Sequence, residues 1–258
     1  MINWHFIYTG ENSGKFNMDF DLHLASICGG EEAFLRLYRW KPYCISLGAG
    51  QNFNEINQPK AKEDKIDIVK RPTGGRAILH AEEITYSVIH PININSSPKK
   101  IFNEINAALL TGLGIYDNRL LAAGLEDVQP DLKSFYKEEV SAVCFASSAK
   151  SEVKFSGKKL IGSAQRKFKD VILQHGSILC GEYHKKISTY LNYISQEDAA
   201  EIINQKTTDI KSILNEEVDY KKLISSLKKG FEKYYSVVFE TADAEQFLIN
   251  KELKTEFI

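Results

Sequence analysis

Residues 66–89 read IDIVKRPTGGRAILHAEEITYSVI, and the adjacent glycines in the middle decide how this part of the chain folds. The residues before the PTGG turn alternate and are rich in Ile and Val, which is typical of a strand. The residues after it are again apolar, β-branched or aromatic. Because Pro and Gly favour a bend, the stretch is predicted to be a strand–turn–strand unit whose glycines let another group approach the backbone.

The spacing of these glycines excludes the two commonest nucleotide-binding loops. A dinucleotide fingerprint needs GxGxxG at the start of a helix, and a phosphate-binding loop needs GxxxxGK followed by Ser or Thr. Neither spacing occurs at Gly74 and Gly75, and no helix is predicted after them. An anion bound at this turn would meet backbone N–H groups and the guanidinium groups of Arg71 and Arg76. The alternative is a tight β-turn with solvated arginines, and the glycines alone do not decide between the two.

Charge and composition exclude several classes of protein. The 258-residue chain carries 33 Lys and Arg residues against 34 Asp and Glu, whereas a dedicated nucleic-acid-binding protein is usually clearly basic. No segment has about 18 consecutive apolar residues, so no membrane-spanning helix is predicted. The N-terminal MINWHFIYTGEN lacks the basic and apolar regions of a signal peptide. We therefore expect a cytoplasmic protein that binds neither nucleic acid nor membranes.

The four cysteines, Cys28, Cys44, Cys144 and Cys180, do not form a metal-binding pattern. They include no CxxC pair, and no His lies at zinc-finger spacing, so no metal site is predicted. A disulfide framework is not expected in a cytoplasmic chain of this size. Each cysteine taken alone is more often a small buried side chain than a nucleophile.

Strand-like segments fill the first two-thirds of the chain, and helical segments fill the last third. Strands are predicted at 4–8, 34–40, 43–48, 66–70, 77–81, 84–89, 140–146, 152–155, 158–167, 170–179 and 237–240. Helices are predicted at 17–30, 60–64, 96–114, 183–194, 195–205 and 218–235. The helix at 17–30 is expected to pack through Met18, Leu22 and Ala25, and Ser97 is expected to cap the helix at 96–114. The pattern predicts an α+β fold with a large mixed β-sheet and packed helices, forming one domain over residues 1–258.

A second motif, GKKLIGSAQRKFKDVILQHGSIL at 157–179, reads as a β-hairpin that turns at Lys169–Asp170. The return strand ends at 175–177, and small residues, among them those at 162–164, would let a ligand lie along the sheet. Lys159 lies in an apolar strand, where burial of its charge is costly unless it meets an anion. The alternative is a surface lysine whose ammonium group reaches solvent.

Taken together, these segments resemble the biotin/lipoate attachment superfamily. The resemblance rests on WKPYCISLG, RPTGGRAILH, ITYSV, the CF pair at 144–145, GKKLIGSAQ and LQHGSIL. It covers most of the chain, from about NMDFD to the helices near residue 235. It implies the catalytic-domain fold that biotin synthetases share with class II aminoacyl-tRNA synthetases, with a helical C-terminal third.

Within this superfamily the chain resembles the cysteine-dependent octanoyltransferases more than the ATP-dependent lipoate–protein ligases. Ligases usually carry a third glycine where this chain has Arg76, and Asp where it has Ala81 after His80. They generally carry Arg-Asn-Asp where this chain has Cys144 and Phe145. The resemblance therefore implies an acyltransferase of lipoate biosynthesis that uses no cofactor.

The resemblance also implies the site residues and the partners. Cys144 would be the nucleophile and Lys159 the cation that holds it as a thiolate, because a free thiol is only a few per cent thiolate at pH 7. The octanoyl group would pass from octanoyl-acyl carrier protein through a Cys thioester to a lysine of an apo lipoyl domain, such as glycine cleavage H protein. The enzyme would be a monomer. The implied substrate-binding residues are Trp40, Arg71, Gly74, Gly75, Arg76, His80, Gly162, Ser163 and His175.

Three alternatives remain open at this point. In a lipoate–protein ligase, the PTGG turn would hold an acyl-adenylate, with ATP and Mg²⁺ as cofactors. An amidotransferase would move the acyl group between lipoyl domains. A non-catalytic acyl-binding module could keep the fold, although it would have no use for the paired Cys144 and Lys159.

Overall fold

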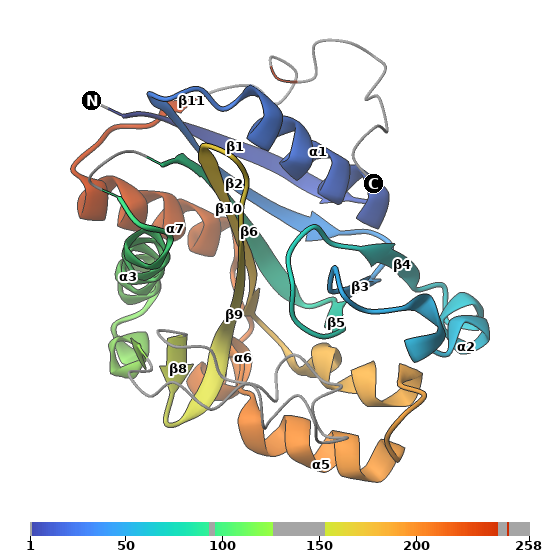
Figure 1. Cartoon of the computed structure of the whole chain (residues 1–258). Coiled ribbons are helices and arrows are strands. Elements are labelled where there is room, and N and C mark those ends of the chain that lie inside the picture. The colour runs from blue at the N-terminus through green and yellow to red at the C-terminus, as the bar shows by residue number, and fades with distance from the viewer. Residues whose placement is uncertain (1, 93–95, 126–152, 242–246, 248–258) are drawn as a thin grey trace.

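A mixed β-sheet runs through the centre of the molecule (Figure 1). The structure is a computed structural model and describes residues 2–92, 96–125, 153–241 and 247. Over these residues the large sheet has eight strands, in the order β11 (Glu240–Thr241), β1 (Asn3–Asn12), β2 (Glu32–Trp40), β6 (Glu83–Pro91), β10 (Val171–Leu179), β9 (Lys158–Lys167), β8 (Val153–Phe155) and β7 (Gly124–Leu125). Strand β1 is parallel to β11 and β2, and the other pairs are antiparallel. The predicted large mixed sheet is confirmed.

The strands around the PTGG turn form a separate small sheet, in the order β4 (Asp67–Lys70), β3 (Cys44–Leu47) and β5 (Ile78–His80). Strand β3 is parallel to β4 and antiparallel to β5. The strands before and after the turn therefore do not pair with each other, because β3 lies between them. The sequence correctly predicts two strands joined by a bend, but pairing with β3 depends on tertiary contacts that the local pattern does not contain.

The helices begin and end close to their predicted positions. They are α1 (Gly14–Ile27), α2 (Gln58–Glu63), α3 (Pro98–Tyr116), α5 (Gln196–Lys206), α6 (Ile210–Leu214) and α7 (Tyr220–Tyr235), with 3₁₀ turns η1 (Phe53–Glu55), η2 (Asn118–Ala122) and η5 (Glu182–Tyr190). The hydroxyl of Ser97 accepts a hydrogen bond from the N–H of Lys100, so the predicted cap of α3 is confirmed. The segment predicted as a helix at 183–194 is mostly 3₁₀. The strand predicted at 140–146 lies outside the described residues.

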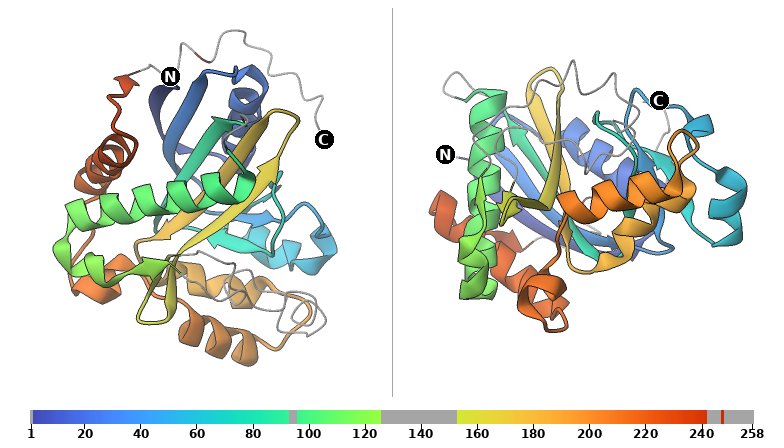
Figure 2. Two further views of the ribbon diagram at one scale, coloured as in Figure 1. Left: turned by 60° about the vertical axis from the view of Figure 1, so that its left-hand side comes forward. Right: turned by 90° about the horizontal axis from the view of Figure 1, so that it is seen from below.

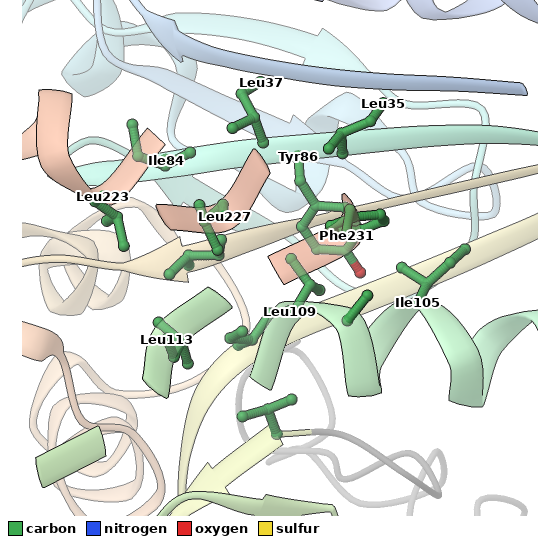
Figure 3. Close-up of a cluster of buried hydrophobic side chains, with 14 of the residues drawn as sticks. Leu35, Leu37, Ile84, Tyr86, Ile105, Leu109, Leu113, Leu223, Leu227 and Phe231 are labelled. Atoms are coloured by element: carbon green, nitrogen blue, oxygen red, sulfur yellow. The ribbon is translucent and has the colours of Figure 1, made fainter. Parts of the chain in front are cut away.

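Helices α3 and α7 cover one face of the large sheet, and α1 covers the other (Figure 2). The α3/α7 face is apolar, and its best-buried side chains are drawn in Figure 3. The side chains labelled there come from β2, β6 and the two helices: Leu35, Leu37, Ile84, Tyr86, Ile105, Leu109, Leu113, Leu223, Leu227 and Phe231. Each such side chain contributes about 1.5–3 kcal/mol by leaving water, so this layer is the main core.

Helix α1 packs differently from its predicted orientation. Its buried residues are Gly14, Asn17, Met18, Phe20, Asp21 and Leu24, whereas Leu22 and Ala25 are only partly buried. The predicted stripe is confirmed for Met18, and Ala25 packs at the edge of a core cluster, but Leu22 is not in the buried face. Asn17 and Asp21 take part in that face because they meet a buried arginine of β2 instead of water. Sequence periodicity counts such residues as solvent-facing.

The small sheet has a hydrophobic cluster of its own. Ile45, Leu47 and Leu79 of this sheet pack against Ile187 and Ile203, which come from η5 and α5. The small sheet also packs against the large one, since Cys44 of β3 clusters with Tyr38 and Trp40 of β2. No helix among the described segments is long and apolar enough to cross a membrane.

Candidate functional site

A pocket of about 380 Å³ lies at the boundary between the two sheets. Its lining comes from α1, from four strands of the large sheet, and from the small sheet with its PTGG loop: Met18, Tyr38, Trp40, Ser46, Arg71, Ile78, His80, Thr85, Gly162, Ser163, Ala164, His175, Gly176 and Ser177. Most of its lining surface is apolar, with a few polar side chains among it, as is typical of small-ligand sites. It is the candidate functional site.

Trp40 forms one wall of the pocket at the end of β2. Its ring stacks on the imidazole of His80, with 4.1 Å between ring centroids and 15° between planes. Its indole Nε1 donates a hydrogen bond to Thr85 Oγ1 at 2.6 Å. The indole is therefore fixed by both its face and its edge, so it can pack against an apolar ligand without rearranging.

His80 is held by the carboxylate of Glu83. The imidazole Nδ1 lies 2.8 Å from Glu83 Oε1, and the hydroxyls of Ser177 and Thr85 donate to the same oxygen. Burial alone would raise the pKa of Glu83, but His80 and these hydrogen bonds outweigh it and hold that pKa below its usual value. Glu83 is therefore ionised at neutral pH and can only accept, so Nδ1 of His80 carries a proton.

Arg71 is folded back over the turn instead of being solvated. It is 3% exposed, and its guanidinium donates to the backbone oxygens of Ser46, Gly74 and Arg76 at 2.7–2.9 Å. It also donates to the Ser46 hydroxyl at 3.1 Å, and that hydroxyl lies 2.7 Å from Nε2 of His80. The solvated-arginine alternative is therefore wrong for Arg71. Arg76 is more exposed and lies 3.6 Å from Glu55.

The turn needs a glycine at position 75 for its backbone conformation rather than for contact with the pocket. Gly75 has a φ of +95°, a region that side chains rarely adopt, whereas a Cβ at Gly74 would meet nothing within 4 Å. Gly74, Gly75 and Arg76 are not part of the described pocket lining. The group that approaches this turn is Gly48, where a Cβ would lie 2.0 Å from the carbonyl oxygen of Gly75.

His175 connects the pocket to a buried charged cluster under α1. Its Nε2 lies 2.6 Å from Thr73 Oγ1, and its Nδ1 lies 3.6 Å from Asp21 Oδ2. Asp21 pairs with Arg36 at 2.7 Å and accepts from the Tyr38 hydroxyl at 3.2 Å. Burial opposes ionisation of Asp21, but Arg36 and His175 outweigh it and lower its pKa. Burial lowers the pKa of His175, so its ring is neutral at pH 7.

The predicted hairpin is confirmed, and its small residues lie in the pocket wall. Strands β9 and β10 pair with Gly176 opposite Ser163 and Ser177 opposite Gly162. A Cβ at Gly176 would lie 2.2 Å from the carbonyl oxygen of Gly162, so the strands approach too closely for a larger residue. The role of Gly162 and Ser163 in ligand binding stays a prediction.

Lys159 is buried, with 2% of its surface exposed, so the alternative of a surface lysine is wrong. It lies on β9 opposite Lys154 of β8, and it is outside the described pocket lining. Burial of Lys154, followed by the nearby charge of Lys159, lowers the pKa of Lys154. Cys144, its predicted partner, lies outside the described residues.

The other three cysteines are poor nucleophiles. Burial raises the pKa of Cys28 to about 12, and it also raises the pKa of Cys44 and Cys180. Because the thiolate is the reactive form, these thiols stay protonated and inert at neutral pH. Over the described ranges, no cluster of three or more His, Cys, Asp or Glu residues could hold a metal ion.

Sequence reasoning did not identify several residues that build the site. They are Asp21, Arg36, Ser46, Thr73, Glu83 and Thr85. One signal was present, since Arg36 lies in a strand between two apolar residues, Leu35 and Leu37. A charged residue inside such a strand indicates a buried partner on the other face.

Comparison with known proteins identifies relatives along nearly the whole chain. Residues 13–232 match the family model described as the lipoyl protein ligase A/B catalytic domain. An octanoyltransferase LipM of Lysinibacillus sphaericus is 34% identical over 245 residues, covering 90% of this chain and 87% of the relative. An octanoyltransferase LipM of Clostridioides difficile is 32% identical over 259 residues, covering 96% and 92%.

Solved structures support the fold. A lipoate-protein ligase A bound with ATP superposes with a TM-score of 0.76 at 18% identity, covering 99% of this chain and 97% of that one. A bipartite lipoate protein ligase from Thermoplasma acidophilum gives a TM-score of 0.74 at 18% identity, covering 99% and 95%. At this identity the likeness establishes the shared α+β architecture.

Proposed function

The chain belongs to the lipoyl protein ligase A/B catalytic domain family, in its octanoyltransferase branch, and from this premise we propose that it transfers an octanoyl group to a lysine of a lipoyl domain in lipoate biosynthesis. The observation that carries the proposal is the match to octanoyltransferases over 90% or more of the chain. Structural neighbours that are lipoate ligases share the fold, but at 18% identity they do not select an activity.

The pocket between the two sheets would hold the acyl chain. Met18, Tyr38, Trp40 and Ile78 supply apolar surface, and the charged groups beside them are already paired within the protein. Burying the apolar carbons beyond the carbonyl of an octanoyl group, at about 0.8 kcal/mol each, gives up to roughly 5–6 kcal/mol before entropy is subtracted. An unbranched apolar chain fits such a site better than a charged ligand does.

The acyl donor in this proposal is octanoyl-acyl carrier protein, and the nucleophile is Cys144. Its thiolate attacks the thioester carbonyl, a new carbon–sulfur bond forms, the carbon–sulfur bond to the carrier breaks, and the carrier leaves as a thiolate that takes up the proton lost by the Cys144 thiol. Support comes from the Cys144–Phe145 pair ahead of GKKLIGSAQ and from the raised pKa values of the three other cysteines. The buried ammonium of Lys159 is the cation proposed to favour the thiolate.

The second step forms the amide. The neutral ε-amine of the acceptor lysine attacks the enzyme thioester, the carbon–sulfur bond breaks, and the proton lost by the amine restores the Cys144 thiol. A thioester is already activated, so the proposed reaction needs neither ATP nor Mg²⁺. A free carboxylate would need a nucleotide to reach the same reactivity.

Intact mass measurement tests the covalent step. Incubation with octanoyl-acyl carrier protein alone is expected to add one octanoyl group, located on the peptide that contains Cys144. Cys144→Ser is expected to abolish transfer, and Cys28→Ser is the matched control that should retain it. Full activity of Cys144→Ser would remove Cys144 from the mechanism.

A second assay tests the donor. The complete reaction, with apo lipoyl domain and no nucleotide, is expected to give octanoyl-lipoyl domain from the carrier-bound donor. Free octanoate with Mg²⁺ and ATP should give none. The reverse result would assign the protein to the ligases.

A further inference from the structure

The acyl pocket is built from two separate sheets, and one buried carboxylate connects them. Glu83 lies at the start of β6 in the large sheet and is 1% exposed. Its partner His80 ends β5 of the small sheet, where it pairs with Cys44 of β3. The contact between Glu83 Oε1 and His80 Nδ1, at 2.8 Å, therefore joins the two walls of the pocket.

The same oxygen of Glu83 holds two more residues of the pocket wall. Ser177 of β10 donates to Glu83 Oε1 at 2.8 Å, and the Thr85 hydroxyl donates to it as well. Thr85 in turn accepts from the indole of Trp40, whose ring stacks on His80. We call these five residues, Trp40, His80, Glu83, Thr85 and Ser177, the Glu83 cluster.

Every member of the Glu83 cluster except Glu83 lines the pocket. Glu83 is behind the wall and does not touch the space that a ligand would fill. Its effect on a ligand would therefore act through the positions of Trp40 and His80. Both residues are buried. His80 contacts Glu83 directly, and Trp40 is connected to Glu83 through the Thr85 hydroxyl.

We propose that Glu83 is a positioning residue that sets the width of the acyl pocket, and with it the preference for an eight-carbon chain. The inference rests on the proposed function, because it takes the pocket as the acyl site. Without an acceptor at Glu83, Nδ1 of His80 loses its shorter contact with the large sheet and keeps the longer one with the Ser177 hydroxyl, at 3.2 Å, while Thr85 loses its orientation. Trp40 then loses a fixed hydrogen-bond partner at its edge and a fixed ring at its face, so the walls can separate and admit longer chains.

Two substitutions separate the acceptor from the charge. In Glu83→Gln, the amide oxygen can take the place of Oε1, while the amide nitrogen takes the place of Oε2, which is buried without a hydrogen-bond partner in the described structure. Glu83→Leu removes the acceptor altogether. We expect Glu83→Gln to retain most of the octanoyl preference. We expect Glu83→Leu to raise KM for the octanoyl donor at least about tenfold, with a smaller fall in kcat, and to bring decanoyl transfer close to octanoyl transfer.

Glu82→Leu is the matched control. Glu82 is the neighbouring carboxylate, it accepts from the backbone N–H of Tyr183, and it does not line the pocket. This variant should keep the wild-type chain-length profile. If Glu83→Leu and Glu82→Leu share that profile, the proposal is wrong.

A measurement without turnover separates this inference from the proposed function. In a Trp4→Phe background Trp40 is the only tryptophan, and its buried ring should resist acrylamide quenching. Glu83→Leu is expected to increase quenching several-fold, whatever reaction the enzyme catalyses. A wild-type protein that transfers no octanoyl group would defeat the proposed function, whereas unchanged quenching would defeat the role of Glu83.

Thr85→Val keeps the test decisive if Glu83→Leu does not fold. It preserves side-chain shape and removes the hydroxyl that accepts from the Trp40 indole and donates to Glu83 Oε1. We expect increased quenching of Trp40 and a chain-length profile broadened in the same direction, to a smaller extent. A folded Thr85→Val protein with wild-type quenching and profile would overturn the proposal.

Discussion

The two faces of the large sheet are built by alternate residues of the same strands, yet they differ in kind. On β2, Leu37 packs under α3 and α7, while Arg36 and Tyr38 on either side of it bond to Asp21 of α1. On β6, Ile84 lies in the apolar layer, and its neighbours belong to the Glu83 cluster. One face supplies the core, and the other supplies the site.

The comparison shows how differently the two faces respond to change. The stability from apolar contacts depends on buried area and volume. Removing a methyl group therefore lowers the free energy of unfolding by an amount set by that group and by the cavity it leaves. A buried ion pair depends on both partners at once. Removing one leaves an uncompensated charge, whereas removing both can be nearly neutral. The site face is therefore expected to show strong coupling between its residues, and the core face is not.

The largest expected effect is that of Arg36→Leu. Arg36 and Asp21 have no exposed side-chain surface, so the variant leaves a buried carboxylate without its partner. We expect it to lower the free energy of unfolding by about 3–5 kcal/mol and to reduce octanoyl transfer, because Asp21 also contacts His175. Urea unfolding and the transfer assay measure the two effects.

The double variant Asp21→Leu/Arg36→Leu shows whether the effect comes from the unpaired charge. It is expected to regain most of the lost stability. If it is as unstable as the sum of the two single variants, the loss comes from packing, and the proposed difference between the faces does not hold.

Leu37→Ala tests the other face at the adjacent residue. The side chain is fully buried in the α3/α7 layer, so a cost of about 3 kcal/mol in unfolding free energy is expected. Transfer by the folded protein, and its chain-length preference, should stay at wild-type values. A shift in chain-length preference would mean that the core face also shapes the pocket.

The pH dependence of stability should depend on the site face. The pKa values of Asp21 and Glu83 are lower in the folded protein than their ordinary values of 3.8 and 4.5. The unfolded state therefore binds protons first, so the stabilisation is present above about pH 4.5 and is lost as the pH falls further. Unfolding measured between about pH 7 and about pH 3 should show a shallower loss in Asp21→Asn, and Leu37→Ala should keep the wild-type slope.

The smallest effect expected is that of Tyr38→Phe. The change removes one hydroxyl that donates to Asp21 and keeps the ring under the Arg36 guanidinium, 3.9 Å away. We expect a loss of about 1 kcal/mol by chemical unfolding. A loss as large as that of Arg36→Leu would show that the hydroxyl, and not the ion pair, organises this face.

Local patterns in the sequence predict most of the fold. Alternation identified β2, β6 and the hairpin of β9 and β10, and the Ser97–Pro98 pair marked the start of α3. Tertiary relations were not predictable. The separate small sheet depends on β3 lying between β4 and β5, and the buried face of α1 depends on Arg36 in another element.

The candidate site was predicted to the extent that its residues lie in recognisable motifs. Trp40, Arg71, His80, Gly162, Ser163 and His175 do meet in one pocket. Gly74, Gly75 and Arg76 belong to the same turn but are not part of the described lining. Glu83 was missed because its role depends on contacts with residues of other strands, such as Ser177 of β10. The spacing of residues along the sequence does not show which strands lie side by side.

A pocket whose walls belong to two sheets links ligand binding to the stability of the fold. An acyl chain that touches both sheets binds only while they are docked, so it acts as a reversible cross-link between them. A ligand at one hundred times its dissociation constant adds about 2.7 kcal/mol to the stability of the state that binds it. Amide hydrogen exchange in β3 and β5 would slow accordingly, so that the loaded enzyme is a more rigid molecule than the empty one.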